Sequence, residues 1–181
     1  MKRMICILLS LALALPALLC AAAEGVTFKT SYYTLTLPAG WEIDTDDAGP
    51  EDGYEFLGGF YSPDDTGLVV FAYLEYYEEL ADVSLWDADD ELIQEYADIL
   101  LEDFSDDNPE YIGVVKAGAI PFVLVRGTDE YGDYLYADTM TNGYAVEFEV
   151  YVMDRDEHQY PLTDAYIEQF ENILATFQPL N

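Results

Sequence analysis

The stretch DYLYADTMTNGYAVEFEVYVM, residues 133–153, decides the fold. Its two halves are rich in β-branched and aromatic residues, and Asn142-Gly143 between them favours a type I′ turn, which needs positive φ at both positions. In the second half Glu147 and Glu149 alternate with four apolar residues: Val146, Phe148, Val150 and Val152. A period of two places alternate residues on opposite faces of a strand. The stretch therefore predicts a β-hairpin whose last strand separates apolar from acidic side chains.

Further strands are expected on the N-terminal side of this hairpin. Two β-rich runs precede it directly, at 111–117 and 120–128, so that four strands follow one another. Residues 62–67 form a good turn sequence between two more predicted strands, 54–61 and 68–76. A shorter hairpin is expected nearer the N-terminus, from the runs 26–30 and 33–37.

Two segments show helical spacing instead. The first has apolar residues at helical intervals from Leu92 to Phe104, with Asp87 as its expected N-cap. The second is expected to begin at the cap Thr163, to carry one apolar stripe as far as Phe177, and to end before Pro179. Each helix has a single apolar stripe, which needs a sheet face to cover it. We therefore expect an α+β domain with a largely antiparallel sheet packed by two helices.

The order of these elements resembles a known family. The motif Leu-Pro-Ala-Gly-Trp at 37–41 follows the short hairpin, and Phe-Glu-Asn-Ile-Leu-Ala-Thr-Phe at 170–177 closes the chain. Together they resemble the PsbP-like fold, which is shared with MOG-type nuclear-import factors and with small secreted bacterial proteins of unknown role. The resemblance implies this fold and a bias toward binding, since family members bind partners such as photosystem subunits or a small GTPase. Both motifs concern packing, so no functional residue is carried over.

Residues 1–23 are typical of a secretory signal peptide. Lys2 and Arg3 precede an apolar run at 5–15, and Ala21-Ala22-Ala23 offers small residues for cleavage after Ala23. The mature chain would be a single acidic domain, 24–181, that works outside the cytoplasm and has no transmembrane segment. A lipoprotein anchored at Cys20 is the alternative, although Leu19 is larger than the residue that such processing prefers.

The charge of the expected mature chain is strongly negative. All 37 Asp and Glu lie after residue 23, against the four cations Lys29, Lys116, Arg126 and Arg155, which gives −33. Nucleic acids are excluded as partners because a phosphate-binding surface needs clustered cations, and anionic lipids are disfavoured for the same reason. Basic proteins and divalent cations are favoured at long range, although high charge also simply keeps a secreted domain soluble and monomeric.

One acidic segment partly matches a calcium-binding loop. Counted from Asp44, the pattern continues with Asp46, Gly49, Asp52 and Glu55 at the positions that an EF-hand uses. The fifth position fails because it is an alanine, and strands rather than helices are expected on both sides. We therefore name these four acids as a candidate Ca²⁺ site, with a solvated acidic loop as the alternative.

Catalytic motifs are weak in this chain. Cys6 and Cys20 both belong to the expected signal peptide, and the single histidine, His158, has no serine near it in sequence. The sequence therefore predicts a non-catalytic binding or accessory domain. The alternative is a small carboxylate-based hydrolase acting on extracellular polymer, which needs two acids at a suitable separation. A pocket with two desolvated acids beside Trp41 or Trp86 would favour this enzyme, and a flat, acidic, tyrosine-lined sheet face would favour binding.

Three further expectations concern single residue types. Arg126 should share a strand face with Phe122 and need a carboxylate partner, for which Glu147 or Glu149 is proposed. Tyrosines beside acids can stack on a sugar or a cationic group, but tyrosine is also a good strand residue, and the sequence favours the second role. Finally, crowding of carboxylates should raise their mean pKa on folding, so that stability falls as pH rises.

Overall fold

The computed structural model describes residues 25–129 and 132–180. The predicted signal peptide, with Cys20, therefore lies outside the described residues. The described residues form two sheets, two α-helices and two short 3-10 helices, η1 (Glu78–Leu80) and η2 (Ser105–Asp107). No helix among the described residues is long and apolar enough to span a membrane.

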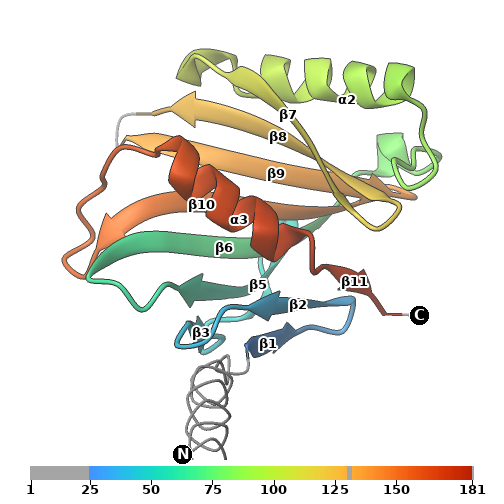
Figure 1. Cartoon of the computed structure of the whole chain (residues 1–181). Coiled ribbons are helices and arrows are strands. Elements are labelled where there is room, and N and C mark those ends of the chain that lie inside the picture. Colours follow the sequence, from blue (N-terminus) through green and yellow to red (C-terminus); the bar gives the residue numbers. More distant parts are fainter. Residues whose placement is uncertain (1–24, 130–131, 181) are drawn as a thin grey trace, which may run out of the picture.

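Most strands belong to one large antiparallel sheet, in the order β3-β5-β6-β10-β9-β8-β7, with β4 paired to β5 (Figure 1). The four-strand succession predicted from the sequence is confirmed, and the last strand of it lies at the centre of the sheet. The bounds of these strands are β3 (Glu42–Asp44), β4 (Gly49–Pro50), β5 (Tyr54–Tyr61), β6 (Thr66–Tyr76), β7 (Glu110–Ala117), β8 (Ile120–Thr128), β9 (Asp133–Thr141) and β10 (Tyr144–Asp154).

The expected N-terminal hairpin is present as a separate layer. β1 (Val26–Lys29) and β2 (Tyr33–Leu37) pair antiparallel, and β11 (Gln178–Pro179) adds to β2 to complete a three-stranded sheet. Asn142 and Gly143 both have positive φ, at 52° and 78°, which confirms the tight turn between β9 and β10.

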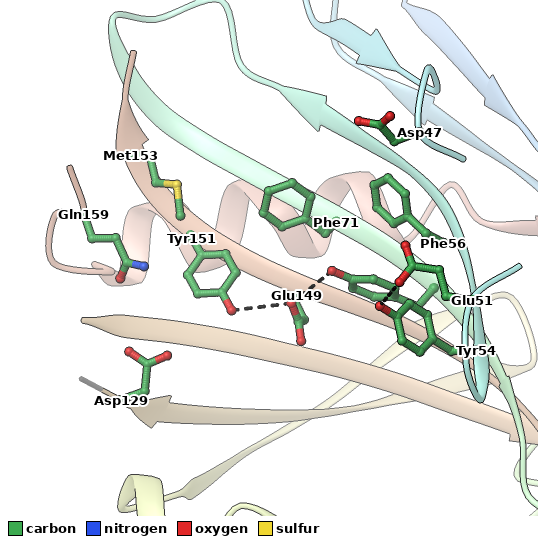
Figure 2. Close-up of a pocket in the computed structure, with 11 residues that line it drawn as sticks. Asp47, Glu51, Tyr54, Phe56, Phe71, Asp129, Glu149, Tyr151, Met153 and Gln159 are labelled. Atoms are coloured by element: carbon green, nitrogen blue, oxygen red, sulfur yellow. Dashed lines mark hydrogen bonds between the residues drawn. The ribbon is translucent and has the colours of Figure 1, made fainter. Parts of the chain in front are cut away.

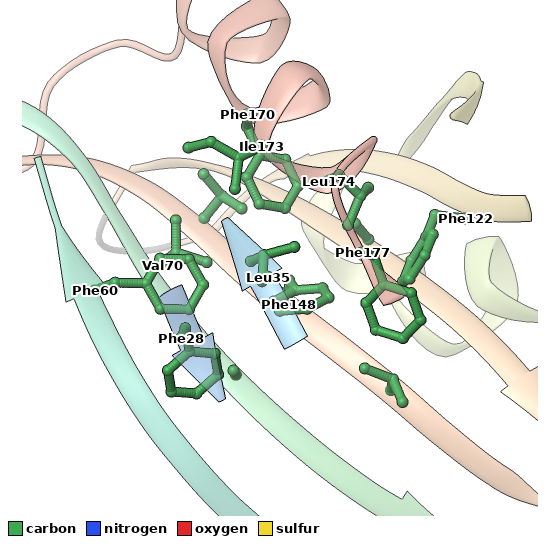
Figure 3. Close-up of a cluster of buried hydrophobic side chains, with 14 of the residues drawn as sticks. Phe28, Leu35, Phe60, Val70, Phe122, Phe148, Phe170, Ile173, Leu174 and Phe177 are labelled. Carbon is green, nitrogen blue, oxygen red and sulfur yellow. The ribbon is translucent and has the colours of Figure 1, made fainter. Parts of the chain in front are cut away.

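The two helices cover opposite faces of the large sheet. Alternate residues of β8 show this: Phe122 and Leu124 pack in a cluster with Phe170 of α3 (Asp164–Leu174), whereas Val123 packs in a second cluster with Ile93 of α2 (Asp90–Asp103). The three-stranded sheet lies on the α3 side, where its apolar residues join the first cluster (Figure 3). The α+β prediction is confirmed, with the helices on two faces.

Three details of the helices differ from the sequence predictions. The N-cap of α2 is Asp89, which accepts a hydrogen bond from the backbone N–H of Leu92 at 3.0 Å, and not Asp87. Thr163 occupies the N-cap position of α3, but its side chain makes no capping hydrogen bond. The helix α3 also ends at Leu174, earlier than expected, because the residues after it leave the helix. Pro179 instead pairs with β2 at the edge of the three-stranded sheet, where the missing N–H of proline is tolerated.

The predicted partner of Arg126 is also wrong. Its guanidinium donates to Asp133 Oδ2 at 3.2 Å and to the carbonyl oxygen of Leu162 at 2.9 Å. Arg126 lies on the α3 side of the sheet, whereas Glu147 and Glu149 project from the opposite side. Arg126 therefore cannot pair with either glutamate through the sheet, and Asp133 on the neighbouring strand β9 is its carboxylate partner.

Candidate functional site

The α2 side of the sheet carries an unusual row of acids and tyrosines. Glu147 at the centre of β10 pairs in register with Tyr73 of β6 and with Asp138 of β9. Residues that are directly opposite in neighbouring antiparallel strands project from the same face, with their Cβ atoms about 5 Å apart. The strand pairing therefore gathers side chains that are far apart in the sequence onto one surface.

One half of this surface is covered by α2. Asp138 is 1% exposed, and the Tyr96 hydroxyl of α2 donates to its Oδ1 at 2.8 Å. The Tyr136 hydroxyl donates to Oδ2 at 3.4 Å. Burial raises the pKa of the Asp138 carboxyl well above its ordinary value, and the neighbouring charge of Glu147 raises it further. This acid is a buried part of the seam between α2 and the sheet.

Glu147 lies at the edge of the same seam. It is 7% exposed and accepts from the Tyr77 hydroxyl at 3.3 Å. Burial raises the pKa of Glu147 to about 7, against the lowering effect of phenol hydrogen bonds. Asp138 and Glu147 face each other without a cation, because the ion pairs among the described residues use the other acids Asp65, Asp133 and Asp154. Burial, rather than the crowding expected from composition, is the first cause of these raised pKa values.

The other half of the surface, over β5, β6 and β10, forms an open groove of about 450 Å³ (Figure 2). Its lining is aromatic and acidic, with four carboxylates and five aromatic rings, and has no Lys, Arg or His among the described residues. The lining residues are Asp47, Glu51, Tyr54, Phe56, Phe71, Tyr73, Asp129, Glu149, Tyr151, Met153 and Gln159.

Glu149 lies in the middle of this groove. The Tyr73 and Tyr151 hydroxyls both donate to its Oε2, at 3.4 and 3.5 Å. Burial raises the pKa of the Glu149 carboxyl, and the charge of Asp129 adds to this rise, while the two phenols act in the opposite direction. Burial also raises the pKa values of Tyr73 and Tyr151, so both phenols keep their protons and remain donors at neutral pH.

The aromatic rings form a continuous row on both sides of Glu149. Tyr73 packs against Tyr54 and Phe56, with ring centroids 5.5 and 5.4 Å apart, and Phe71 lies 6.1 Å from Tyr151. A register shift in β5 follows Phe56 at Gly58, where φ is 135°; a side chain at Gly58 would collide with the backbone oxygen of Asp44. The glycine lets β3 approach β5 closely, next to the groove.

A second hollow, of about 660 Å³, adjoins the first and shares Phe71 and Met153 with it. It lies beside the turn between β5 and β6 and includes the acidic pair Asp64-Asp65. Arg155 also lines it and forms an exposed ion pair with Asp65 at 3.6 Å. Since this hollow contains its own cation, it matches a cationic ligand less well than the groove at Glu149.

The four acids of the predicted calcium loop lie around the turns between β3 and β5. Asp44 ends β3 and accepts from the backbone N–H of Asp46 at 2.9 Å, and Asp52 precedes β5. Glu55 accepts from the Tyr32 hydroxyl at 2.8 Å. Within residues 25–129 and 132–180, no group of three or more acids or histidines is arranged to hold a metal ion. Ca²⁺ binding by this loop stays a prediction.

The groove residues were not singled out from the sequence. The sequence marks Glu149 as a polar residue of an alternating strand and favours an ordinary strand role for the tyrosines, but nothing in it joins Tyr73 to Glu149. The sequence signal that could have identified the groove is the recurrence of acids and tyrosines at every second position of β10, together with the same spacing in β6. The face on the α2 side is acidic and tyrosine-lined, but it is hollowed into a groove and is not flat; Trp41 lies in the apolar core of the other face.

Comparison with known proteins gives likeness in structure alone. No protein-family model and no curated protein sequence matches this chain. The solution structure of cyanobacterial PsbP (CyanoP) from Synechocystis sp. PCC 6803 is similar with a TM-score of 0.48 and 14% identity, over 89% of this chain and 95% of that one. A crystal structure from Bacteroides thetaiotaomicron VPI-5482 gives a TM-score of 0.45 and 15% identity, over 87% of this chain and 49% of the other, so this chain spans about half of that protein. These likenesses concern the fold alone; the α+β class that the sequence predicts is given by the strands and helices of this chain itself.

Proposed function

We propose that this protein is a non-catalytic binding domain that works outside the cytoplasm and binds a basic polypeptide segment in the groove on the α2 side of its sheet. The observation that carries the proposal is the lining of the groove, whose described residues combine four carboxylates with five aromatic rings and include no basic side chain. The expected signal peptide at 1–23 supports the location.

The chemistry of the groove favours cations attached to an apolar stem. Aromatic faces attract cations and also bury methylene groups, and the carboxylates supply the opposite charge. The net charge of −31 raises the local concentration of basic partners by long-range attraction. A polypeptide rich in Lys or Arg offers both the cation and the apolar stem, whereas a bare divalent cation would use the carboxylates alone.

The hydrolase alternative has less support. The two most strongly desolvated acids, Asp138 and Glu147, do lie side by side, but Tyr96 of α2 contacts Asp138 directly. A polymer substrate would have to displace α2 to reach both carboxyls. In the open groove, Glu149 and Asp129 are both only half-buried, and Glu51 and Asp47 on the rim are exposed, so none of the four is as deeply buried as Asp138 or Glu147.

The proposal is tested by reversing charge at the rim. Isothermal titration calorimetry would measure binding of a peptide containing both Lys and Arg, with a peptide of equal length carrying Gln instead as the neutral comparison. We expect salt-dependent binding of the basic peptide to the wild type, and a loss of at least about tenfold for Asp47→Lys/Glu51→Lys, which places two repelling charges at the groove.

The matched control is Glu95→Lys/Glu102→Lys, which makes the same change of net charge at exposed positions of α2. If attraction to the whole protein were responsible, both double variants would weaken binding equally. Equal weakening, or no binding of the basic peptide to the wild type, would contradict a basic-peptide site in the groove.

A further inference from the structure

Within that proposed function, we infer that the groove is selective for lysine over arginine: one lysine side chain of the partner places its ammonium at Oε1 of Glu149 and packs its methylene stem on the surrounding aromatic rings. This deepens the proposed function by naming the group that is recognised and the residue that recognises it.

The hydrogen bonds of Glu149 leave one oxygen for a ligand. Both phenol donors, Tyr73 and Tyr151, reach Oε2, and no described residue donates to Oε1. The two bonds are also long, since O–H···O⁻ hydrogen bonds to a carboxylate are usually about 2.6 Å. Glu149 is therefore held in place from one side, while its other oxygen has no donor among the described residues, and none of the described lining residues is a cation.

A nearby cation strongly stabilises the charged form of a carboxylate in this setting. Burial and the nearby charge of Asp129 both disfavour the ionised form, which is why the pKa of Glu149 is raised. A bound ammonium reverses this effect because it favours the charged carboxylate. Binding of lysine should therefore release a proton from Glu149 over the pH range in which the free carboxyl is partly protonated, and it should strengthen as pH rises through that range.

The single available oxygen favours an ammonium over a guanidinium. Arginine binds carboxylates best through two parallel hydrogen bonds to both oxygens, and Oε2 of Glu149 is already occupied by two phenols. An ammonium is a compact charge that needs one strong acceptor and can place its remaining donors toward water or the rim acids.

The rings around Glu149 suit the rest of the lysine side chain. Tyr73 and Tyr151 lie on β6 and β10 with their hydroxyls converging on Glu149, and Phe71 packs beside Tyr151 (Figure 2). A four-carbon stem crossing these rings buries apolar surface, and its charged end lies near aromatic faces, which attract cations.

The experiment compares three peptides of equal length in which glycine alternates with Lys, Arg or Gln. Binding to the full mature chain is measured by calorimetry, together with the Glu149→Gln variant, which keeps the shape and removes the charge. We expect the Lys peptide to bind several-fold more tightly than the Arg peptide, and Glu149→Gln to weaken Lys binding about tenfold. The control Glu168→Gln removes an exposed charge on α3, on the other side of the sheet, and should leave binding unchanged.

A second variant tests the reason for the selectivity. Tyr73→Phe/Tyr151→Phe removes both phenol donors and frees Oε2, so Glu149 can then offer two oxygens. We expect the preference for Lys over Arg to shrink in this variant, a change in selectivity that general loosening of the fold would not produce. Thermal unfolding of each variant confirms that it is folded at the temperature of the titration.

The outcomes separate this inference from the function on which it rests. If Lys and Arg peptides bind equally and Glu149→Gln has no effect, while Asp47→Lys/Glu51→Lys still weakens binding, the groove binds basic peptides and the lysine site at Glu149 is wrong. If neither basic peptide binds more tightly than the Gln peptide, the proposed function itself is wrong.

Discussion

The two faces of strand β10 show how one alternating sequence produces two different surfaces. On the α3 side, Val146, Phe148, Val150 and Val152 are all buried in an apolar cluster. On the α2 side, the intervening residues include Glu147 and Glu149, and their neighbours are phenols and other acids. The first face stabilises the fold by excluding water. The second is covered only in part, so it has both a buried polar seam and an open groove.

The largest expected difference between the faces is in packing. Phe148→Ala should lower the free energy of unfolding by about 3–5 kcal/mol, because the ring is fully buried and its removal leaves a cavity. Phe71→Ala on the groove side removes a similar ring that is half-exposed, and should cost clearly less. Urea unfolding of both variants measures this, and equal losses would show that the groove face contributes to the core as much as the α3 face does.

The next prediction concerns pH and the buried seam. Because the pKa of Glu147 rises from its ordinary 4.5 to about 7 on folding, the folded state binds more protons than the unfolded state between these values. The stability that this protonation provides is complete below about pH 4.5 and is lost as pH rises through about 7. For this one group the loss is on the order of 3 kcal/mol.

Glu147→Gln tests this pH dependence. The amide is similar in shape and does not titrate, so unfolding of the variant should vary less with pH between 5 and 8 than that of the wild type. Chemical denaturation at several pH values checks it. An unchanged slope in the variant would mean that Glu147 is not the group that titrates, and the partner Asp138, whose pKa is also raised by burial, would be examined in the same way.

The smallest expected effect is at the contact between α2 and the sheet. Tyr96→Phe removes the hydroxyl that donates to Asp138 at 2.8 Å, and should lower the free energy of unfolding by about 1–2 kcal/mol. Tyr136→Phe removes the longer bond of 3.4 Å to the same carboxyl and should cost less. Thermal unfolding compares the two variants. No loss of stability for Tyr96→Phe would indicate that the Tyr96–Asp138 hydrogen bond does not help to hold α2 on the sheet.

Much of the local structure could be predicted from the sequence because it depends on neighbouring residues. The alternation in β10, the Asn142-Gly143 turn and the apolar stripe of α3 are short-range patterns, and the strands and helices they predicted are confirmed. The sequence predictions were wrong for smaller features, such as a helix cap, where several residues could fill one role. Asp87 and Asp89 are equally suitable as caps by type, and only the position of α2 against the sheet selects Asp89.

The groove depended on information that the sequence does not hold locally. Acidic composition predicts cationic partners, and the period of two determined that Glu147 and Glu149 share a face. Only the tertiary structure placed Tyr73 beside Glu149, because β6 and β10 are paired across about seventy intervening residues. It also decided that α2 covers one half of this face and leaves the other open, since a helix of this length cannot cover every strand.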